Sequence, residues 1–252
     1  MEINELMPVE PKLAATIILL RERVREFDAK DDCDFEVFMA KRHANNKFLG
    51  KHHVFPGGGI AEQDISKESL MRVSGLDNNL LENYTGICEH PSCLWIIAIR
   101  ELFEETGVLI ATEESGSLFT LNDDNIENFR RYQENLQEKR DIMTDILAKE
   151  NLYYAADELK YFGRLITPAL SPIRFDTHFF LCKLPLKQNI NLCTTELQEG
   201  SWGSPKHLLE LYKKKQIKMI FPQYSALRRL RKFRTIHEAF NNSKSMFRKI
   251  RL

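Results

Sequence analysis

The chain has few cysteines, and no two of them are spaced as metal or redox sites require. Its 252 residues include five cysteines without a Cys-X-X-Cys pair. Small secreted proteins that depend on disulfides carry even numbers of cysteines at short spacings. We therefore expect free thiols and an intracellular, reducing compartment.

The sequence also lacks a long apolar run. The longest such run near the N-terminus covers residues 13–20, whereas a membrane-spanning helix needs about 20 apolar residues. Glu2, Glu5 and Glu10 occupy the place where a secretory signal would carry basic residues. We expect neither a signal peptide nor a transmembrane segment.

Net charge is absent overall, because 36 basic residues balance 36 acidic ones. With 43% hydrophobic and 29% charged residues, the composition is that of a globular protein and excludes a mainly disordered chain. The balance hides an asymmetry. Residues 201–252 hold 14 bases and 2 acids, so the remainder of the chain is acidic. This polarity along the chain is a feature that a functional account has to explain.

Apolar periodicity predicts strands and helices in alternation. β-branched and aromatic residues mark strands, and apolar residues three and four positions apart mark helices. The predicted strands cover residues 12–20, 34–41, 161–166 and 174–184, and the predicted helices cover residues 92–106, 123–150 and much of the chain after 204. Gly107 stands where a helix C-terminus favours glycine. No repeat or linker divides the chain, so we expect a single domain over residues 1–252.

The most informative stretch is Arg100-Glu101-Leu102-Phe103-Glu104-Glu105-Thr106-Gly107-Val108. On a helix, Glu101, Glu104 and Glu105 project from one face and repel each other. A hard divalent cation such as Mg²⁺ or Mn²⁺ removes this repulsion and prefers oxygen ligands. A solvated acidic helix end is the alternative, and the triplet alone favours that alternative.

A glycine run, residues 57–59, follows an apolar strand upstream of the acidic turn. Glycine permits unusual backbone angles and close approach to another element. Such a run carries little information alone, but together with the acidic turn it matches a known pattern.

That pattern is the Nudix box, which the sequence from Gly58 to Val108 resembles. The box reads Gly, five residues, Glu, seven residues, then Arg-Glu-aliphatic-X-Glu-Glu-X-Gly-aliphatic. Its second half matches at every specified position from Arg100 to Val108. Its first half departs from the pattern in two ways. Asp64 stands where the box has Glu, and the box spacing leads from there to Arg72, whose neighbours do not continue the box. The arginine that does continue it is Arg100, so 28 extra residues interrupt the box. Asp64 is expected to keep a supporting role.

An interrupted box resembles the branch of the Nudix superfamily that includes the peroxisomal coenzyme A diphosphatases. Segments 165–180, 202–205 and 222–230 are similar to that branch as well. The resemblance implies an α/β/α sandwich around a mixed β-sheet with a helical insertion. Within this single Nudix domain we expect an insertion at 65–91, a helical insertion at 112–160 and a basic helical segment at 204–252.

The resemblance also assigns a metal site. It implies that Glu104 and Glu105 ligate Mg²⁺ or Mn²⁺, that Glu101 is a further ligand or orients the base, and that a backbone carbonyl near Gly58 completes the shell. Arg100 is expected to pair with a glutamate rather than touch the substrate.

Less specific assignments concern the base and the substrate contacts. Glu196 and Glu199 are candidates for the general base, and ordinary surface acids are the alternative. Arg42 and Arg174 suit phosphate binding because guanidinium binds phosphate in a bidentate manner, and residues 57–58 flank the same site. Arg174 could equally be satisfied locally at a strand edge.

The activity implied is metal-dependent hydrolysis of a nucleoside diphosphate linked to another group, most directly coenzyme A or acyl-coenzyme A. ADP-ribose, dinucleotides and capped RNA are alternative substrates. A non-catalytic nucleotide- or RNA-binding protein is an alternative from another class, which loss of a box glutamate would favour. Glu101, Glu104 and Glu105 are all present, so this alternative ranks last.

The basic segment at 204–252 has three interpretations. It could bind phosphates of the substrate, it could bind RNA or an anionic membrane surface, or it could be a solvated helix face. The last three residues, 250–252, are only loosely similar to a peroxisomal signal. Cytoplasm and peroxisome therefore both stay open as locations, as does assembly into a homodimer.

Overall fold

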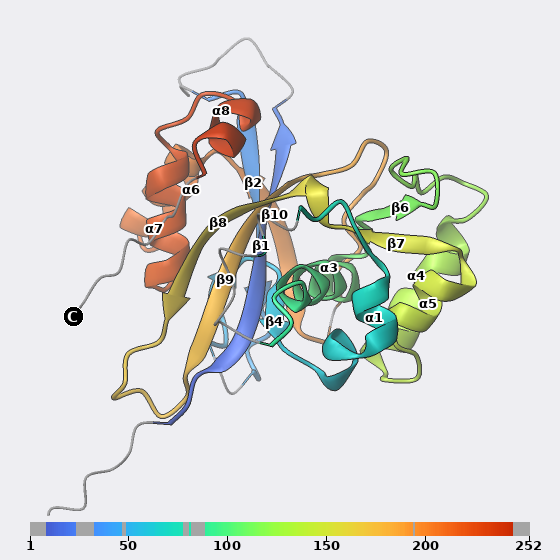
Figure 1. Cartoon of the computed structure of the whole chain (residues 1–252). Helices are drawn as coiled ribbons and strands as arrows, with labels where there is room; N and C mark the ends of the chain where they lie inside the picture. Colours follow the sequence, from blue (N-terminus) through green and yellow to red (C-terminus); the bar gives the residue numbers. More distant parts are fainter. Residues whose placement is uncertain are drawn as a thin grey trace, which may run out of the picture.

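A mixed sheet of seven strands forms the centre of the computed structural model, which describes residues 9–23, 33–46, 49–77, 81, 89–193 and 195–243 (Figure 1). The five main strands lie in the order β10 (Leu197–Gly203), β2 (Phe35–Arg42), β1 (Lys12–Glu22), β9 (Phe175–Lys183) and β8 (Leu159–Ile166). Two short strands, β3 (His53–Val54) and β4 (Gly57–Gly59), pair with β2 and β1. Only β1 and β9 run parallel in this sheet.

The central strand β1 is buried on both of its faces. Ile17 and Leu19 pack into one hydrophobic cluster, and Ile18 and Leu20 pack into the other. Successive side chains of a strand point to opposite faces, so a continuous apolar run requires a cover on each side. The strands predicted over 12–20, 34–41, 161–166 and 174–184 are all confirmed.

Helices supply that cover. On one face lies α3 (Cys93–Thr106), with α4 (Ile126–Gln137) and α5 (Met143–Lys149) in the same hydrophobic cluster. On the other face lie α6 (Pro205–Lys213), α7 (Phe221–Leu230) and α8 (Ile236–Asn241). The expected α/β/α sandwich is thereby confirmed, as are the helices predicted over 92–106 and after 204.

A second, smaller sheet joins the two expected insertions. Its strands lie in the order β5 (Val73–Ser74), β7 (Leu152–Ala155) and β6 (Ala111–Glu113). The 3-10 helix η1 (Glu62–Ile65) and α1 (Lys67–Met71) precede β5, and the 3-10 helix η2 (Ala156–Glu158) follows β7. The segment 112–160 is expected to be helical, but it also contains the strand β7. This strand pairs with β5 from the other insertion and with β6.

Some of the expected features include residues that the structure does not describe. Residues 78–80 and 82–88 of the 65–91 insertion, and the C-terminal residues 244–252, lie outside the described residues. Cys33, Cys93, Cys182 and Cys193, the four cysteines among the described residues, are free thiols. Among the helices of the described residues, none is both long enough and apolar enough to cross a membrane.

Candidate active site

The glycine strand β4 lies directly against the acidic end of α3. Gly58 pairs with Ala15 of β1, and a Cβ atom at Gly58 would lie 2.5 Å from the carboxylate of Glu101. The backbone N–H of Gly57 donates a hydrogen bond to Oε2 of Glu105 at 3.0 Å. Glycine is therefore required at position 58 because no side chain fits between the strand and Glu101.

The three glutamates of the last turns of α3 share a site that disfavours their charge. Glu105 is only 4% exposed, and burial together with repulsion from Glu101 raises its pKa well above the usual range. Burial also raises the pKa of Glu101 to about 7, although the Arg100 guanidinium opposes the shift. Burial likewise raises the pKa of Glu104. A cation bound among these oxygens would offset both the cost of burying the charges and the repulsion between them.

Arg100 organises these carboxylates from one side. Its guanidinium contacts Glu101 at 2.8 Å and Glu104 at 3.3 Å through Nη1. Its Nε and Nη2 donate to the two carboxylate oxygens of Asp64 at 2.7 and 3.0 Å. Nη2 also donates to the carbonyl of Gly59. The pairing of Arg100 with glutamates agrees with the expectation, and Asp64 has the supporting position expected for the first acidic residue of the box.

The loop before β10 is attached to the same turn. The backbone N–H of Cys193 donates to the carbonyl of Glu105 at 2.9 Å. Three residues on, Glu196 adds to the raised pKa values of Glu104 and Glu105 through its negative charge, after burial as the main cause. Arg42 lies 4.0 Å from Glu196 and opposes the shift at Glu105. The structure therefore places Glu196 near Glu104 and Glu105, and Arg42 near Glu105.

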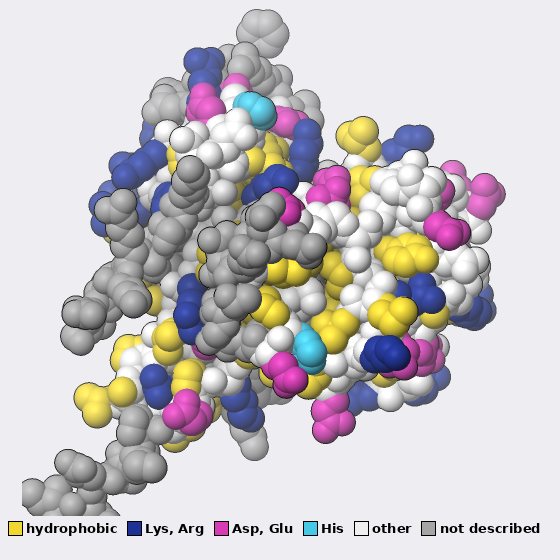
Figure 2. Space-filling view, in the orientation of Figure 1, with side chains coloured by type: hydrophobic (Ala, Val, Ile, Leu, Met, Phe, Trp, Pro, Cys, Tyr) yellow, Lys and Arg dark blue, Asp and Glu magenta, His cyan; other side chains and the backbone are white. Residues whose placement is uncertain are grey.

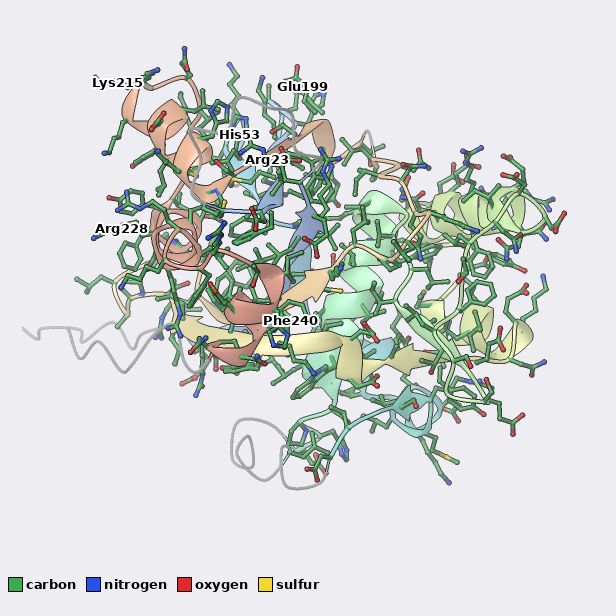
Figure 3. All side chains as sticks on the ribbon, turned by 90° about the horizontal axis from the view of Figure 1, so that it is seen from above. Arg23, His53, Glu199, Lys215, Arg228 and Phe240 are labelled. Atoms are coloured by element: carbon green, nitrogen blue, oxygen red, sulfur yellow. The ribbon has the colours of Figure 1, made fainter. Side chains whose placement is uncertain are left out.

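Two other predicted residues have different surroundings. The side chain of Glu199 is 74% exposed and lies 3.7 Å from the ammonium of Lys41, at the sheet edge where Figure 3 also shows His53. Arg174 donates to the carbonyls of Thr167 and Val9, which is the local arrangement that the sequence left as its alternative. None of the described contacts joins either residue to the glutamates.

The described part of the basic segment, residues 204–243, lies across the sheet from the glutamates. Lys and Arg side chains gather over α6–α8 at the upper left of Figure 2, and Figure 3 labels Lys215 and Arg228 there. The helices that carry them pack on the face of the sheet opposite α3. Binding of RNA or an anionic surface by this segment stays a prediction.

The sequence reasoning missed Gln133 of α4. Its side chain amide donates to the carbonyl of Glu104 at 3.2 Å and to that of Asn191 at 2.9 Å. Phe129, Gln133 and Leu136 are buried on one face of the helix, so a polar residue on an apolar stripe was the available signal. No motif marks it.

The chemistry of the donor set fits a hard divalent cation. Carboxylate oxygens are the ligands that Mg²⁺ and Mn²⁺ prefer, and the site holds three carboxylates whose negative charge is disfavoured. Across the part of the chain that the structure describes, no three acidic, histidine or cysteine side chains already form a ready-made metal group. Because Arg100 already contacts Glu101 and Glu104, a cation would compete with its guanidinium for these two carboxylates.

Known proteins resemble the chain in both sequence and fold. The family model of the NUDT19 Nudix domain matches residues 83–230. Acyl-coenzyme A diphosphatase NUDT19 of Xenopus laevis is 28% identical over 235 residues, which cover 81% of this chain and 62% of that protein. Putative nudix hydrolase 7 of Caenorhabditis elegans is 30% identical over 199 residues, or 78% of this chain and 52% of that protein. The chain thus spans between half and two thirds of the length of these relatives.

The fold comparison points the same way. A crystal structure of a NUDIX hydrolase from Alicyclobacillus acidocaldarius superposes with a TM-score of 0.71 at 23% identity, covering 95% of this chain and 99% of that one. The match of the family model over more than half of the sequence, with the box glutamates in place, decides the family. The chain belongs to the NUDT19 Nudix domain family of Nudix hydrolases.

Proposed function

We propose that the chain hydrolyses the diphosphate bond of a nucleoside diphosphate linked to another group, with coenzyme A or acyl-coenzyme A as the substrate class. The observation that carries the proposal is the turn of α3 with Glu101, Glu104 and the buried Glu105, held against the glycine strand β4. Similarity to the acyl-coenzyme A diphosphatase of Xenopus laevis supports the substrate class.

The side chains suit distinct tasks in this hydrolysis. Glu101, Glu104 and Glu105 would hold Mg²⁺ or Mn²⁺, with the backbone near Gly58 alongside. When bound, the cation neutralises charge on the diphosphate and lowers the pKa of water. Glu196 would take the proton of the attacking water at its carboxylate, because its loop is hydrogen-bonded to the backbone of Glu105 through Cys193 and its carboxylate lies beside Arg42. Arg42, 4.0 Å from Glu196, would bind phosphate oxygens of the substrate, because guanidinium suits bidentate contacts.

A substrate panel tests the proposal. Purified protein is incubated with Mg²⁺ or Mn²⁺ and coenzyme A, acetyl-coenzyme A, ADP-ribose, a dinucleoside polyphosphate or a capped RNA, and the products are separated by chromatography. We expect coenzyme A or its acyl derivative to be split into 3′,5′-ADP and a phosphopantetheine product. Glu105→Gln should abolish the reaction, because one oxygen ligand and its charge are lost.

The outcomes separate the alternatives. Cleavage of ADP-ribose, a dinucleotide or capped RNA, with coenzyme A untouched, would replace the substrate class and keep the chemistry. Cleavage of nothing on the panel would favour the binding-protein alternative. A rise of the melting temperature with Mn²⁺ in wild type, but not in Glu105→Gln, reports the metal site without turnover.

A further inference from the structure

The last turn of α3 is fastened at every one of its terminal carbonyl groups. The last four carbonyls of a helix have no partner within the helix and need one elsewhere. Gly107 N–H binds the carbonyl of Phe103, Cys193 N–H that of Glu105, and Asn191 N–H that of Thr106. The remaining carbonyl, that of Glu104, accepts hydrogen bonds only from side chains of α4 among the described residues.

Gln133 donates one of the two hydrogen bonds to the carbonyl of Glu104. The residue is only 1% exposed, and its Nε2 donates to the carbonyl of Glu104 at 3.2 Å and to that of Asn191 at 2.9 Å. Its Oε1 accepts from Nδ2 of Asn191 at 2.8 Å. The buried amide therefore uses both donors and its acceptor, which makes its position and orientation well defined.

Three separate segments meet at this amide. One is α4, the second is the turn of α3 that carries the glutamates, and the third is the loop that holds Asn191, Cys193 and Glu196. Glycine at position 107 leaves space for this amide, because a Cβ atom there would lie 2.9 Å from Oε1 of Gln133. Gln137, one turn further along α4, also donates to the carbonyl of Glu104, at 2.9 Å. No described hydrogen bond connects Gln137 to the loop.

We propose that Gln133 is a positioning residue that fixes the spacing between the glutamates of α3 and Glu196. Gln133 ties the backbone of Glu104 to that of Asn191, and Glu196 is five residues beyond Asn191 on the same loop. This role rests on the proposed hydrolysis and makes the 112–160 insertion part of the catalytic assembly. A displacement of about 1 Å between reacting groups can lower a rate about 100-fold.

Gln133→Met and Gln137→Met form the matched pair that tests this. Methionine keeps the length and approximate volume of glutamine and removes the amide. We expect Gln133→Met to lower kcat at least tenfold at saturating metal, with KM changed less than about twofold, because substrate contacts stay. Gln137→Met should keep kcat within about threefold of wild type. In an Asn191→Ala background, Gln133→Met should cost much less than in wild type, because the two residues share one link.

A second measurement does not depend on turnover. Hydrogen exchange of the Asn191 and Cys193 amides should become at least tenfold faster in Gln133→Met and stay near wild type in Gln137→Met, at a pH where both variants are folded. If wild type hydrolyses nothing on the panel, the proposed function fails, and exchange still tests the link. Equal exchange in the two variants, or a folded Gln133→Met with wild-type kcat, would overturn the positioning role.

Discussion

The guanidinium of Arg100 holds both carboxylate oxygens of Asp64, and neither side chain is more than 5% exposed. The same guanidinium contacts Glu101 and Glu104. Asp64 therefore holds the guanidinium of Arg100 in the position where it contacts the glutamates, although Asp64 lies 36 residues before Arg100 in the sequence.

Asp64→Asn should destabilise the protein strongly. It removes a buried charge whose partner stays buried, which typically costs about 3–5 kcal/mol. Because Arg100 keeps its contacts to Glu101 and Glu104, we expect a loss of about 3 kcal/mol. Urea unfolding followed by circular dichroism measures it. The control is Glu127→Gln, which breaks the exposed pair with Arg130 and should change stability by less than about 0.5 kcal/mol. Similar losses in both variants would contradict the prediction.

Gly58→Ala should impair hydrolysis far more than Gly59→Ala. An added Cβ at Gly58 meets the Glu101 carboxylate at 2.5 Å, whereas at Gly59 the nearest atom is the Leu13 carbonyl oxygen at 3.8 Å. Moving Glu101 should lower kcat about 100-fold, and Gly59→Ala should stay within about threefold of wild type. Initial rates with coenzyme A measure both. A folded Gly58→Ala with normal kcat would show that Glu101 is not held there for function.

Glu196→Gln and Glu199→Gln should separate the two candidates for the base. Both side chains are exposed, but the charge of Glu196 acts on Glu105, whereas Glu199 lies beside Lys41. General-base catalysis typically contributes about 100-fold to 10,000-fold, so Glu196→Gln should lose at least about 100-fold in kcat. Glu199→Gln should change kcat less than about twofold. The reverse order in single-turnover rates would transfer the role to Glu199.

Asp176 should make the protein sensitive to strong acid. Burial alone would raise the pKa of Asp176, but hydrogen bonding to Arg164 and the neighbouring His178 lower it to about 2. A lowered folded-state pKa gives stability that is present above the unfolded value near 4 and is lost as the pH falls towards about 2. The difference corresponds to about 2 kcal/mol.

Asp176→Asn removes this dependence. Unfolding free energies measured between about pH 5 and 2 should fall less steeply in Asp176→Asn than in wild type. The exposed residue Asp123 provides the control, and Asp123→Asn should keep the wild-type slope. A wild-type slope in Asp176→Asn as well would show that the contact with Arg164 contributes nothing to acid stability.

Local patterns in the sequence predicted much of the fold and the helical turn that carries Glu101, Glu104 and Glu105. The run at 12–20 is apolar throughout because both helical layers cover β1, and the box from Arg100 to Gly107 follows helical spacing and ends at a glycine with φ 69°. Such features depend on neighbouring residues, and periodicity reveals them. The roles of Arg42 and Glu196 as functional residues stay predictions.

Long-range pairing could not be predicted in the same way. Val73 pairs with Tyr154 in the small sheet, and two short segments so far apart carry no pattern that selects one partner. Gln133 escaped for a similar reason, because its three hydrogen bonds go to Glu104 and Asn191 rather than to residues near it in sequence. Residues that join separate segments are recognisable only once the segments are placed.

The parallel pairing of β1 with β9 determines when this protein can complete its fold. Lys12 pairs with Phe175, which follows 163 positions later, and the pairing continues to Lys183. Contacts at such separation slow folding, because a long loop has to close before they form. During synthesis β1 emerges early and stays an unpaired apolar segment on that side until β9 has been made, which exposes it to aggregation and to chaperones. The other edge of β1 pairs with β2 and β4, which follow soon after it in the chain, so β1 is paired on both edges only when β9 arrives.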